Sequence, residues 1–245
     1  IIDSLMDPHL FYDGRDTMNI DLDIFYQTDS SKFNAITAPS DKENMVYVTD
    51  DFGGVNNQYR IIEIDFYRSL LLELANGDTV WSFMGRFGST VKGFGTGAGT
   101  VNGPLGLDVD YQGNLYYTQA GDYFPAHMII PDFSGDFAVY TSGFQPGADD
   151  IMEANRFSNA EDIAVDNNRS IYVVDNVNRD VTVFNSYGDF FKKVGYGQDS
   201  LKILAEPVAA TVDQNGVLYV CDRSDGAIYR FRLSNELNED IIQED

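Results

Sequence analysis

The stretch EDIAVDNNRSIYVVDNVNRDVTVFNSYGDFFKKVG, residues 161–195, consists of short apolar runs of similar length, separated by turns rich in Asp, Asn and Gly. Branched aliphatic and aromatic residues dominate the runs, and such residues fit the pleated, half-buried surface of a β-sheet. Asn and Gly tolerate the positive φ angles of tight turns, and Asp caps neighbouring backbone amides. The stretch therefore predicts four short antiparallel strands joined by tight turns.

This unit occurs four times along the chain. Its second run carries an apolar–Tyr pair, and it appears as MVYVTD, NLYYTQ, SIYVVD and VLYVCD at 45–50, 114–119, 170–175 and 217–222. A single four-stranded sheet cannot bury both of its faces, whereas copies packed around an axis can. We therefore expect an all-β fold, a β-propeller of four-stranded antiparallel blades. We count four blades, with five or six as the alternative.

The repeats also predict the domain organisation. We expect one propeller domain over residues 1–245, which begins with an N-terminal extension over residues 1–34 and ends with an acidic tail over residues 235–245. The repeats span about 35–85, 103–143, 159–195 and 206–234. The fourth repeat shows no outer strand, because its tail is too acidic to be a convincing one. The alternating run at 18–26 is predicted to close the last blade and so to remove an exposed sheet edge.

Two segments, PLGLDVDYQGNLYYTQ and AEDIAVDNNRSIYVVDNVNRDVTVFNSYGDFFKKVG, resemble NHL repeats. The resemblance is strong over residues 103–195, fair over 206–234 and degraded over 35–85. It places six residues on the NHL pattern: Asp166, Tyr172, Asp175, Asn178, Arg179 and Phe184. The chain departs from the pattern at Gln119, where an Asp is expected, and at GDYFPAH, which replaces the Asn-x-Arg element. The resemblance implies a propeller, usually of six blades. It leaves the activity open, because NHL-like and related propellers include protein-binding and RNA-binding platforms and a few metal-dependent lyases and lactonases.

Charge narrows the possible partners. The chain has 16 Lys and Arg against 39 Asp and Glu, a net charge of −23, which repels phosphate backbones and argues against nucleic-acid binding. The chain contains no run of 18 apolar residues, so direct membrane insertion is not expected. The acidity predicts an extracellular or cell-envelope protein, of bacterial origin, whose targeting segment is absent from this chain. Cys221 is the single cysteine and is expected to be a small buried hydrophobe.

Long loops on one face of the propeller are the expected place for binding. Aromatic residues at a loop tip can anchor a partner, and acidic residues close in sequence can share a cation. The binding candidates on this loop face are Tyr123, Phe124, Asp149, Asp150, Glu153, Arg179 and Arg223.

A second set of candidates ends the Tyr-bearing strands: Asp50, Asp175 and Asp222. We interpret these carboxylates as caps that accept backbone hydrogen bonds. If they instead pointed to a central channel, they would favour a bound cation there, with calcium as the ion.

The sequence contains few signs of a catalytic site. Two histidines, His9 and His127, cannot form a multi-histidine metal site, and the chain contains no Gly-x-Ser-x-Gly or His-Glu-x-x-His motif. The sequence therefore favours a non-enzymatic binding or scaffold propeller that engages a protein or glycan through the loop face and needs no cofactor. The alternative is a divalent-metal-dependent hydrolase or lyase of the lactonase-like kind.

Overall fold

The structure is a computed structural model, and it describes residues 33–40, 45–50, 59–73, 79–92, 101–119, 126–132, 139–144, 157–197, 201–233 and 241–244. These residues form strands and turns without a helix. Accordingly, they include no helix with the length and apolar character that a membrane span requires. The all-β prediction is confirmed.

The strands form four separate four-stranded antiparallel sheets, each made of strands consecutive in the sequence. The first sheet contains β1 (Phe33–Thr37), β2 (Met45–Asp50), β3 (Arg60–Glu73) and β4 (Thr79–Lys92). The second contains β5 (Pro104–Val109), β6 (Leu115–Gln119), β7 (Ala126–Asp132) and β8 (Val139–Phe144). The third contains β9 (Ala160–Val165), β10 (Ile171–Asp175), β11 (Asp180–Phe184) and β12 (Phe190–Val194). The fourth contains β13 (Pro207–Val212), β14 (Val217–Asp222), β15 (Ala227–Arg232) and β16 (Ile241–Glu244).

The outer edge of the fourth sheet corrects a prediction. The tail was expected to contribute no strand, but residues 241–244 form β16 and pair antiparallel with β15. This strand occupies the edge that was assigned to the N-terminal run 18–26, which itself lies outside the described residues. Pairing with an existing strand edge satisfies backbone hydrogen bonds and outweighs the poor strand propensity of an acidic segment.

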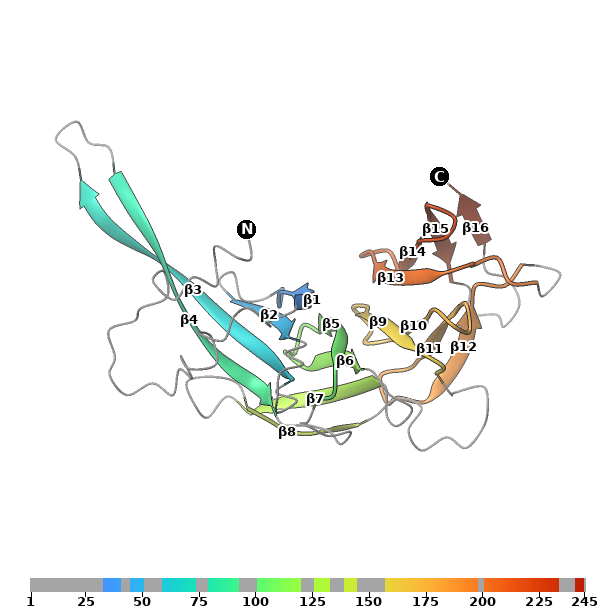
Figure 1. The fold of residues 1–245 in the computed structure, drawn as a ribbon, viewed down its shortest axis with the longest axis horizontal. Coiled ribbons are helices and arrows are strands. Elements are labelled where there is room, and N and C mark those ends of the chain that lie inside the picture. Colours follow the sequence, from blue (N-terminus) through green and yellow to red (C-terminus); the bar gives the residue numbers. More distant parts are fainter. Residues whose placement is uncertain are drawn as a thin grey trace.

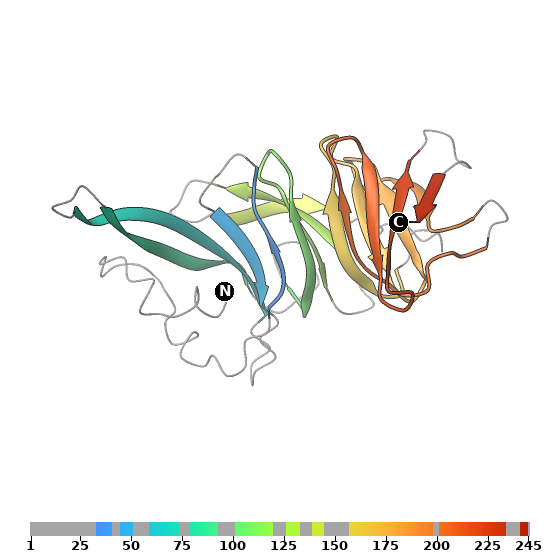
Figure 2. The ribbon, with the colours of Figure 1, turned by 90° about the horizontal axis from the view of Figure 1, so that it is seen from above.

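The four sheets follow one another along an arc, and the described strands do not complete a ring (Figure 1). The number of blades in a closed propeller therefore stays a prediction. In each sheet one strand lies innermost, and contacts between successive sheets include those of β1 with β5, β5 with β9 and β9 with β13. Seen from above, β3 and β4 extend beyond the other strands as a long ribbon (Figure 2).

Three apolar cores fill the spaces between successive sheets. The core between the first and second sheets contains Tyr47, Ile61, Leu107, Tyr117 and Ile129. The core between the second and third sheets contains Tyr116, Met128, Ile163, Val173 and Phe184. The core between the third and fourth sheets contains Tyr172, Val181, Val183, Val220 and Phe231. Because each middle sheet is covered on both faces, its second strand, β6 or β10, is buried in every position.

Cys221 differs from its prediction. It lies in the apolar run of β14, yet its side chain is exposed. Leu218 and Val220 of this strand point into the core with the third sheet, so Cys221, one residue further, points to the opposite face. The expectation of a buried cysteine was wrong because no described sheet covers this face.

Candidate functional site

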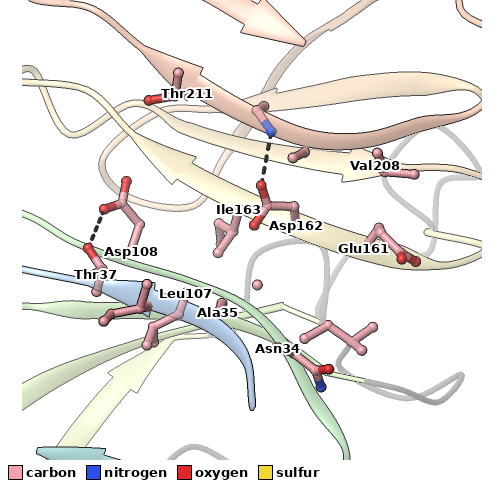
Figure 3. A pocket seen from close by; sticks show the side chains of 15 residues that line it. Asn34, Ala35, Thr37, Leu107, Asp108, Glu161, Asp162, Ile163, Val208 and Thr211 are labelled. Carbon is pink, nitrogen blue, oxygen red and sulfur yellow. Dashed lines mark hydrogen bonds between the residues drawn. The ribbon is translucent and has the colours of Figure 1, made fainter. Parts of the chain in front are cut away.

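The innermost strands of the four sheets line a partly open cavity of about 520 Å³ (Figure 3). Its walls are residues 34–37 of β1, 105–108 of β5, 161–163 of β9 and 208–211 of β13. Every sheet thus contributes the corresponding part of its first strand. The volume lies within the usual range of small-ligand sites.

Bulges at the starts of the innermost strands shape this cavity. The pairing of β1 with β2 shifts register between Phe33 and Ile36, and the pairing of β5 with β6 shifts between Pro104 and Leu107. In each of these two sheets, a buried threonine on the second strand accepts a hydrogen bond from the backbone amide of a residue in the bulge. Thr49 Oγ1 lies 2.8 Å from Ala35 N, and Thr118 Oγ1 lies 2.8 Å from Gly106 N. Bulges redirect side chains locally, and both of these lie within the strand segments that line the cavity.

Asp108 bridges three strands at the cavity wall. Its Oδ2 accepts a 2.7 Å hydrogen bond from the amide of Val165 in the third sheet, and its Oδ1 accepts a 3.1 Å bond from the hydroxyl of Thr37 in the first. The amide of Val109 donates a further bond of 2.8 Å. Burial raises the pKa of Asp108, although these three hydrogen bonds act in the opposite direction.

Asp162 repeats this arrangement one sheet further along. Its Oδ2 accepts a 2.9 Å hydrogen bond from the amide of Ala210 in the fourth sheet. Burial raises the pKa of Asp162 to about 7, and the charges of Asp108 and Glu161 also raise it, against the lowering effect of backbone amides. Gly106 lies so close that a Cβ atom there would be 2.4 Å from Asp162 Oδ1. Only glycine permits this approach of β5 to β9.

Glu161 is the third carboxylate of the cavity, and its side chain is half-buried. Its Oε2 accepts hydrogen bonds from the side-chain amides of Asn159 at 2.8 Å and Asn176 at 2.9 Å. These two amides fix the carboxylate at the cavity rim. No bond to Oε1 is recorded among the described residues, so this oxygen offers an acceptor to a ligand.

The cavity lining is therefore acidic and rich in hydrogen-bond acceptors. Asn34, Thr37 and Thr211 add an amide and two hydroxyl groups, and the described lining residues include no Lys, Arg or His. The accessible lining is more polar than apolar, so a ligand here would be held mainly by polar contacts. A cavity of this charge, within a chain of net charge −23, attracts cations and repels anions.

The strand-ending aspartates lie elsewhere, inside their own sheets. Asp175 is fully buried and accepts amide hydrogen bonds from Ser158 at 2.6 Å and from Asn178 at 2.8 Å. Asp222 accepts them from Ala205 at 2.7 Å and from Glu206 at 2.9 Å. Burial acts to raise the pKa of Asp222, but the backbone hydrogen bonds outweigh it and lower this pKa.

Asp50 and Gln119 show two variations of the same position. Asp50 is buried and forms an ion pair with Arg60, with 2.9 Å between Nη2 and Oδ2. Gln119 Oε1 accepts a 3.1 Å hydrogen bond from Asn102 N, seventeen residues earlier in the chain. Asp175 and Asp222 bind Ser158 and Ala205 across the same separation. Gln119 thus replaces the expected Asp as an acceptor at this position.

The loop-face candidates are only partly described. Arg179 is exposed in the turn after β10, with a φ of 56°. Arg223 is exposed and forms an ion pair with Glu206, which lowers the pKa of Glu206. The remaining five, Tyr123, Phe124, Asp149, Asp150 and Glu153, lie outside the described residues.

A divalent metal does not fit the described part of the cavity. Among the described residues, no group of three or more His, Cys, Asp or Glu side chains could hold a metal ion. Asp108, Asp162 and Glu161 direct their oxygens to backbone and side-chain amides. Calcium requires six to eight oxygen ligands, which these side chains do not converge to supply.

Sequence reasoning missed Asp108, Glu161 and Asp162 as parts of one site. The aligned repeats contain a signal, because Asp162 stands in its inner strand where the neighbouring repeats have Gly106 and Ala209. A charged residue at a position otherwise held by small residues marks a local departure from the repeat. The bulges that bring these side chains together left no such mark in the sequence.

No protein-family model matches this sequence, and no curated protein matches it. Among solved structures, a gluconolactonase from Xanthomonas campestris is similar to this chain, with 12% sequence identity and a TM-score of 0.45. The match covers 72% of this chain and 50% of the gluconolactonase chain. Virginiamycin B lyase from Staphylococcus aureus has 13% identity, with coverages of 88% and 70% and a TM-score of 0.46. Regucalcin from Agrobacterium tumefaciens, a calcium-binding protein, has 8% identity, with coverages of 80% and 55% and a TM-score of 0.49.

This chain thus spans about half the length of the gluconolactonase and of regucalcin. Two of the three proteins are named for an enzymatic activity and the third for calcium binding. At such low identities and TM-scores, these likenesses concern the path of the chain and carry no activity over to it. The NHL assignment stays a prediction.

Proposed function

We propose that this chain is a ligand-binding propeller whose site is the central cavity, and that its ligand is a small molecule with a positive charge. The observation that carries the proposal is the described part of the cavity lining, in which three carboxylates occur without a basic side chain. Fixed carboxylates favour a cation most where water is partly excluded, as it is beside Asp108 and Asp162. Because burial raises the pKa of Asp162 to about 7, this side chain contributes its full charge only above that pH. Glu161 contributes the carboxylate at the rim.

A pair of sugars of equal size tests this proposal. Glucosamine carries an ammonium group where glucose carries a hydroxyl, so calorimetric titration of both isolates the effect of the charge. We expect saturable binding of glucosamine that exceeds the binding of glucose. Glu161→Gln should weaken the binding, whereas Glu206→Gln, which removes an equal charge from a half-buried residue outside the cavity, should not. Equal binding of both sugars, or equal effects of both variants, would contradict the proposal.

A second candidate function is acid–base catalysis in the same cavity, as in a hydrolase or lyase. The observation that favours it is the pKa of Asp162, which burial raises to about 7. A carboxyl group with a pKa near neutrality can both donate and accept a proton at physiological pH. This candidate requires no metal.

Hydrolysis of δ-gluconolactone, followed by titration of the released acid, tests the second candidate. Asp162→Asn should abolish turnover, and the wild-type rate should change with pH around 7. A rate that survives Asp162→Asn would exclude Asp162 as the acid or base. The earlier predictions of a protein or glycan partner on the loop face, and of an extracellular or cell-envelope location, stand as further proposals.

A further inference from the structure

Hydrogen bonds within the protein already use most of the side-chain donors of the central cavity. Nδ2 of Asn34 donates a 2.8 Å bond to the backbone carbonyl of Pro104, and the hydroxyl of Thr37 donates one of 3.1 Å to Asp108. A carbonyl oxygen can only accept, so the bond to Pro104 fixes which way the Asn34 amide is turned. Among the described residues, no donor to Oδ1 of Asn34 or to Oε1 of Glu161 is recorded. Both oxygens are therefore available to accept a hydrogen bond from a ligand.

Backbone amides at the cavity wall are used in the same way. The amide of Val165 donates to Asp108 at 2.7 Å, and the amide of Ala210 donates to Asp162 at 2.9 Å. Each of these bonds joins two neighbouring sheets, so a ligand cannot take over the amide without loosening the wall. These amides are thus not donors to a ligand.

Few donors remain for a ligand. With its carboxylates ionised, the described lining keeps two side-chain donors, the second N–H of Asn34 and the hydroxyl of Thr211, both on exposed residues. A carboxylate accepts at up to about four positions and donates at none, so the acceptors of the cavity outnumber its donors. A ligand that matches this lining must donate more hydrogen bonds than it accepts.

The apolar part of the described lining is aliphatic and contains no aromatic ring, with Ile36, Leu107 and Val208 among its members. Quaternary ammonium ions have no N–H group, and proteins recognise them with the faces of aromatic rings. A primary ammonium group instead carries N–H donors, which form strong hydrogen bonds with carboxylate oxygens. The described lining therefore suits a primary ammonium and lacks what a quaternary ammonium requires.

Glu161 and Asn34 lie toward the same end of the cavity. Each stands near the start of an innermost strand, whereas Thr37 and Asp108 lie near the ends of theirs (Figure 3). Two asparagine amides hold Oε2 of Glu161, at 2.8 and 2.9 Å, and so position this carboxylate in the absence of a ligand. A group that is already in place loses little conformational freedom when a ligand binds.

We propose that the ligand of this cavity is a primary ammonium compound whose N–H groups donate to Oε1 of Glu161 and Oδ1 of Asn34, and that a quaternary ammonium of equal charge is rejected. This inference rests on the proposed function, because it specifies the kind of cation that the cavity binds. Methylation of the nitrogen keeps the charge but removes the donors, and it leaves the two acceptors without partners. Complete methylation should therefore weaken binding roughly tenfold or more.

Three small alcohols test the inference in titrations of the whole chain followed by NMR of the ligand. Ethanolamine carries a primary ammonium, choline carries a trimethylated one, and ethylene glycol has no charge. A pH of about 8 keeps both cations charged and lies above the pKa of Asp162, which burial raises to about 7. We expect ethanolamine to bind more tightly than ethylene glycol, and its dissociation constant to be roughly a tenth or less of that of choline.

Glu161→Gln separates the loss of donors from the size of the methyl groups. Asn159 and Asn176 donate to one oxygen of Glu161, so the oxygen of the glutamine should remain there and its NH₂ group should replace the accepting Oε1. The variant should therefore weaken ethanolamine more than choline, which loses only the attraction of the charge. Glu206→Gln, outside the cavity, should leave the ratio of the two affinities unchanged.

The outcomes distinguish this inference from the proposed function. Equal affinities of ethanolamine and choline, both above that of ethylene glycol, would overturn the inference and leave the proposed function standing. Two cations that bind no better than ethylene glycol would contradict the proposed function and the inference with it. Equal weakening of both cations by Glu161→Gln would also overturn the inference, because the methyl groups would then act through their size alone.

Discussion

The hydroxyl group of Tyr172 donates a 3.0 Å hydrogen bond to Oδ2 of Asp166, six residues earlier in the chain. The other oxygen of Asp166, Oδ1, accepts hydrogen bonds of 2.8 Å from the backbone amides of Asn168 and Ser170. These two bonds close the turn between β9 and β10. The aspartate therefore links the turn to a tyrosine that is buried between two sheets. The same link joins Tyr116 to Asp110 at 3.0 Å and Tyr219 to Asp213 at 3.4 Å.

This link predicts that Tyr172→Phe destabilises the protein while leaving its core filled. The variant keeps the buried ring but removes the donor to Asp166, so we expect the free energy of unfolding to fall by about 1 kcal/mol. Urea denaturation followed by circular dichroism measures the change. Tyr187→Phe, at a side chain that is 81% exposed, is the matched control and should change stability by less than about 0.5 kcal/mol. Equal effects of both variants would show that the buried bond contributes nothing.

The Asp–Tyr link also shows why the sequence predicted the sheets well. The spacing of six residues between Asp and Tyr is local, because it includes only one turn and parts of two strands. Each such unit therefore carries its own signal in the sequence. The strands of 161–195 were predicted from their apolar runs and turn residues, which are also local, and the structure forms all four of them.

The features that sequence reasoning missed depend on contacts between distant segments. β16 forms in an acidic tail because β15 offers it an edge, and Cys221 is exposed because no described sheet follows the fourth. The cavity residues come from four strands, and bulges rather than residue type set their direction. None of these relationships leaves a pattern within a single repeat.

Gly106 provides a second prediction, on the contact between β5 and β9. A Cβ atom at this position would lie 2.4 Å from Asp162 Oδ1 and 2.5 Å from Asp162 Cα. Because one of these atoms is backbone, Gly106→Ala must push the two strands apart, and we expect a loss of about 3 kcal/mol or more. Thermal and urea denaturation measure this loss.

Gly226→Ala separates the clash from the general cost of replacing a glycine. Gly226 has a φ of 63°, and nothing lies within 4 Å of a Cβ atom built on it. Its replacement by alanine adds backbone strain of about 1 kcal/mol without a clash. A loss for Gly106→Ala no larger than that for Gly226→Ala would contradict the close approach of the strands.

Asp162 predicts how stability depends on pH. Its pKa is raised from an unfolded value of 3.8 to about 7 in the folded chain, chiefly by burial. Between about pH 4 and pH 7 the folded state therefore holds a proton that the unfolded state has lost, and stability must fall as the pH rises through this window. Asp162→Asn removes the titrating group and should reduce this fall, as measured by urea denaturation at several pH values.

Asp222→Asn is the control of opposite sign. Its pKa is lowered in the folded chain, so its contribution to stability is present above the unfolded value of 3.8 and is lost as the pH falls through the folded pKa. The Asn variant should therefore alter the pH dependence in the acidic range and leave the fall between pH 4 and 7 intact. If both variants changed the same pH range equally, general charge repulsion would explain the effect in place of the burial of Asp162.

Calcium should bind the described cavity weakly. The carboxylates of Asp108 and Asp162 already accept backbone amides from neighbouring sheets, and a divalent ion would have to displace them. After treatment with a chelator, calorimetric titration of calcium at moderate salt should give small heats without saturation, as expected for diffuse counterions around a charge of −23. Saturable binding of one ion at micromolar affinity would contradict this prediction. Its loss in Asp162→Asn would then assign the ion to the cavity.

Two arginines with left-handed backbones give the last prediction. Arg169 has a φ of 64° and Arg179 one of 56°, at turn positions where the fourth sheet has Gly216 and Gly226. Arg169 offsets its strain with an ion pair across to Asp110, with 2.9 Å between Nε and Oδ2, whereas Arg179 is exposed in the turn after β10. Arg179→Gly should therefore stabilise the protein by about 1 kcal/mol, because glycine adopts this conformation without strain.

Arg169→Gly is the matched comparison and should not stabilise the protein. It relieves similar strain but removes a partner of the buried Asp110, a loss of about 1–3 kcal/mol. Urea denaturation of both variants compares the two positions directly. Backbone strain tends to persist where a side chain serves function, so a stabilised Arg179→Gly that loses a partner on the loop face would identify Arg179 as a binding residue. Destabilisation by Arg179→Gly would instead mean that its side chain supports the fold, and the strain would need no functional explanation.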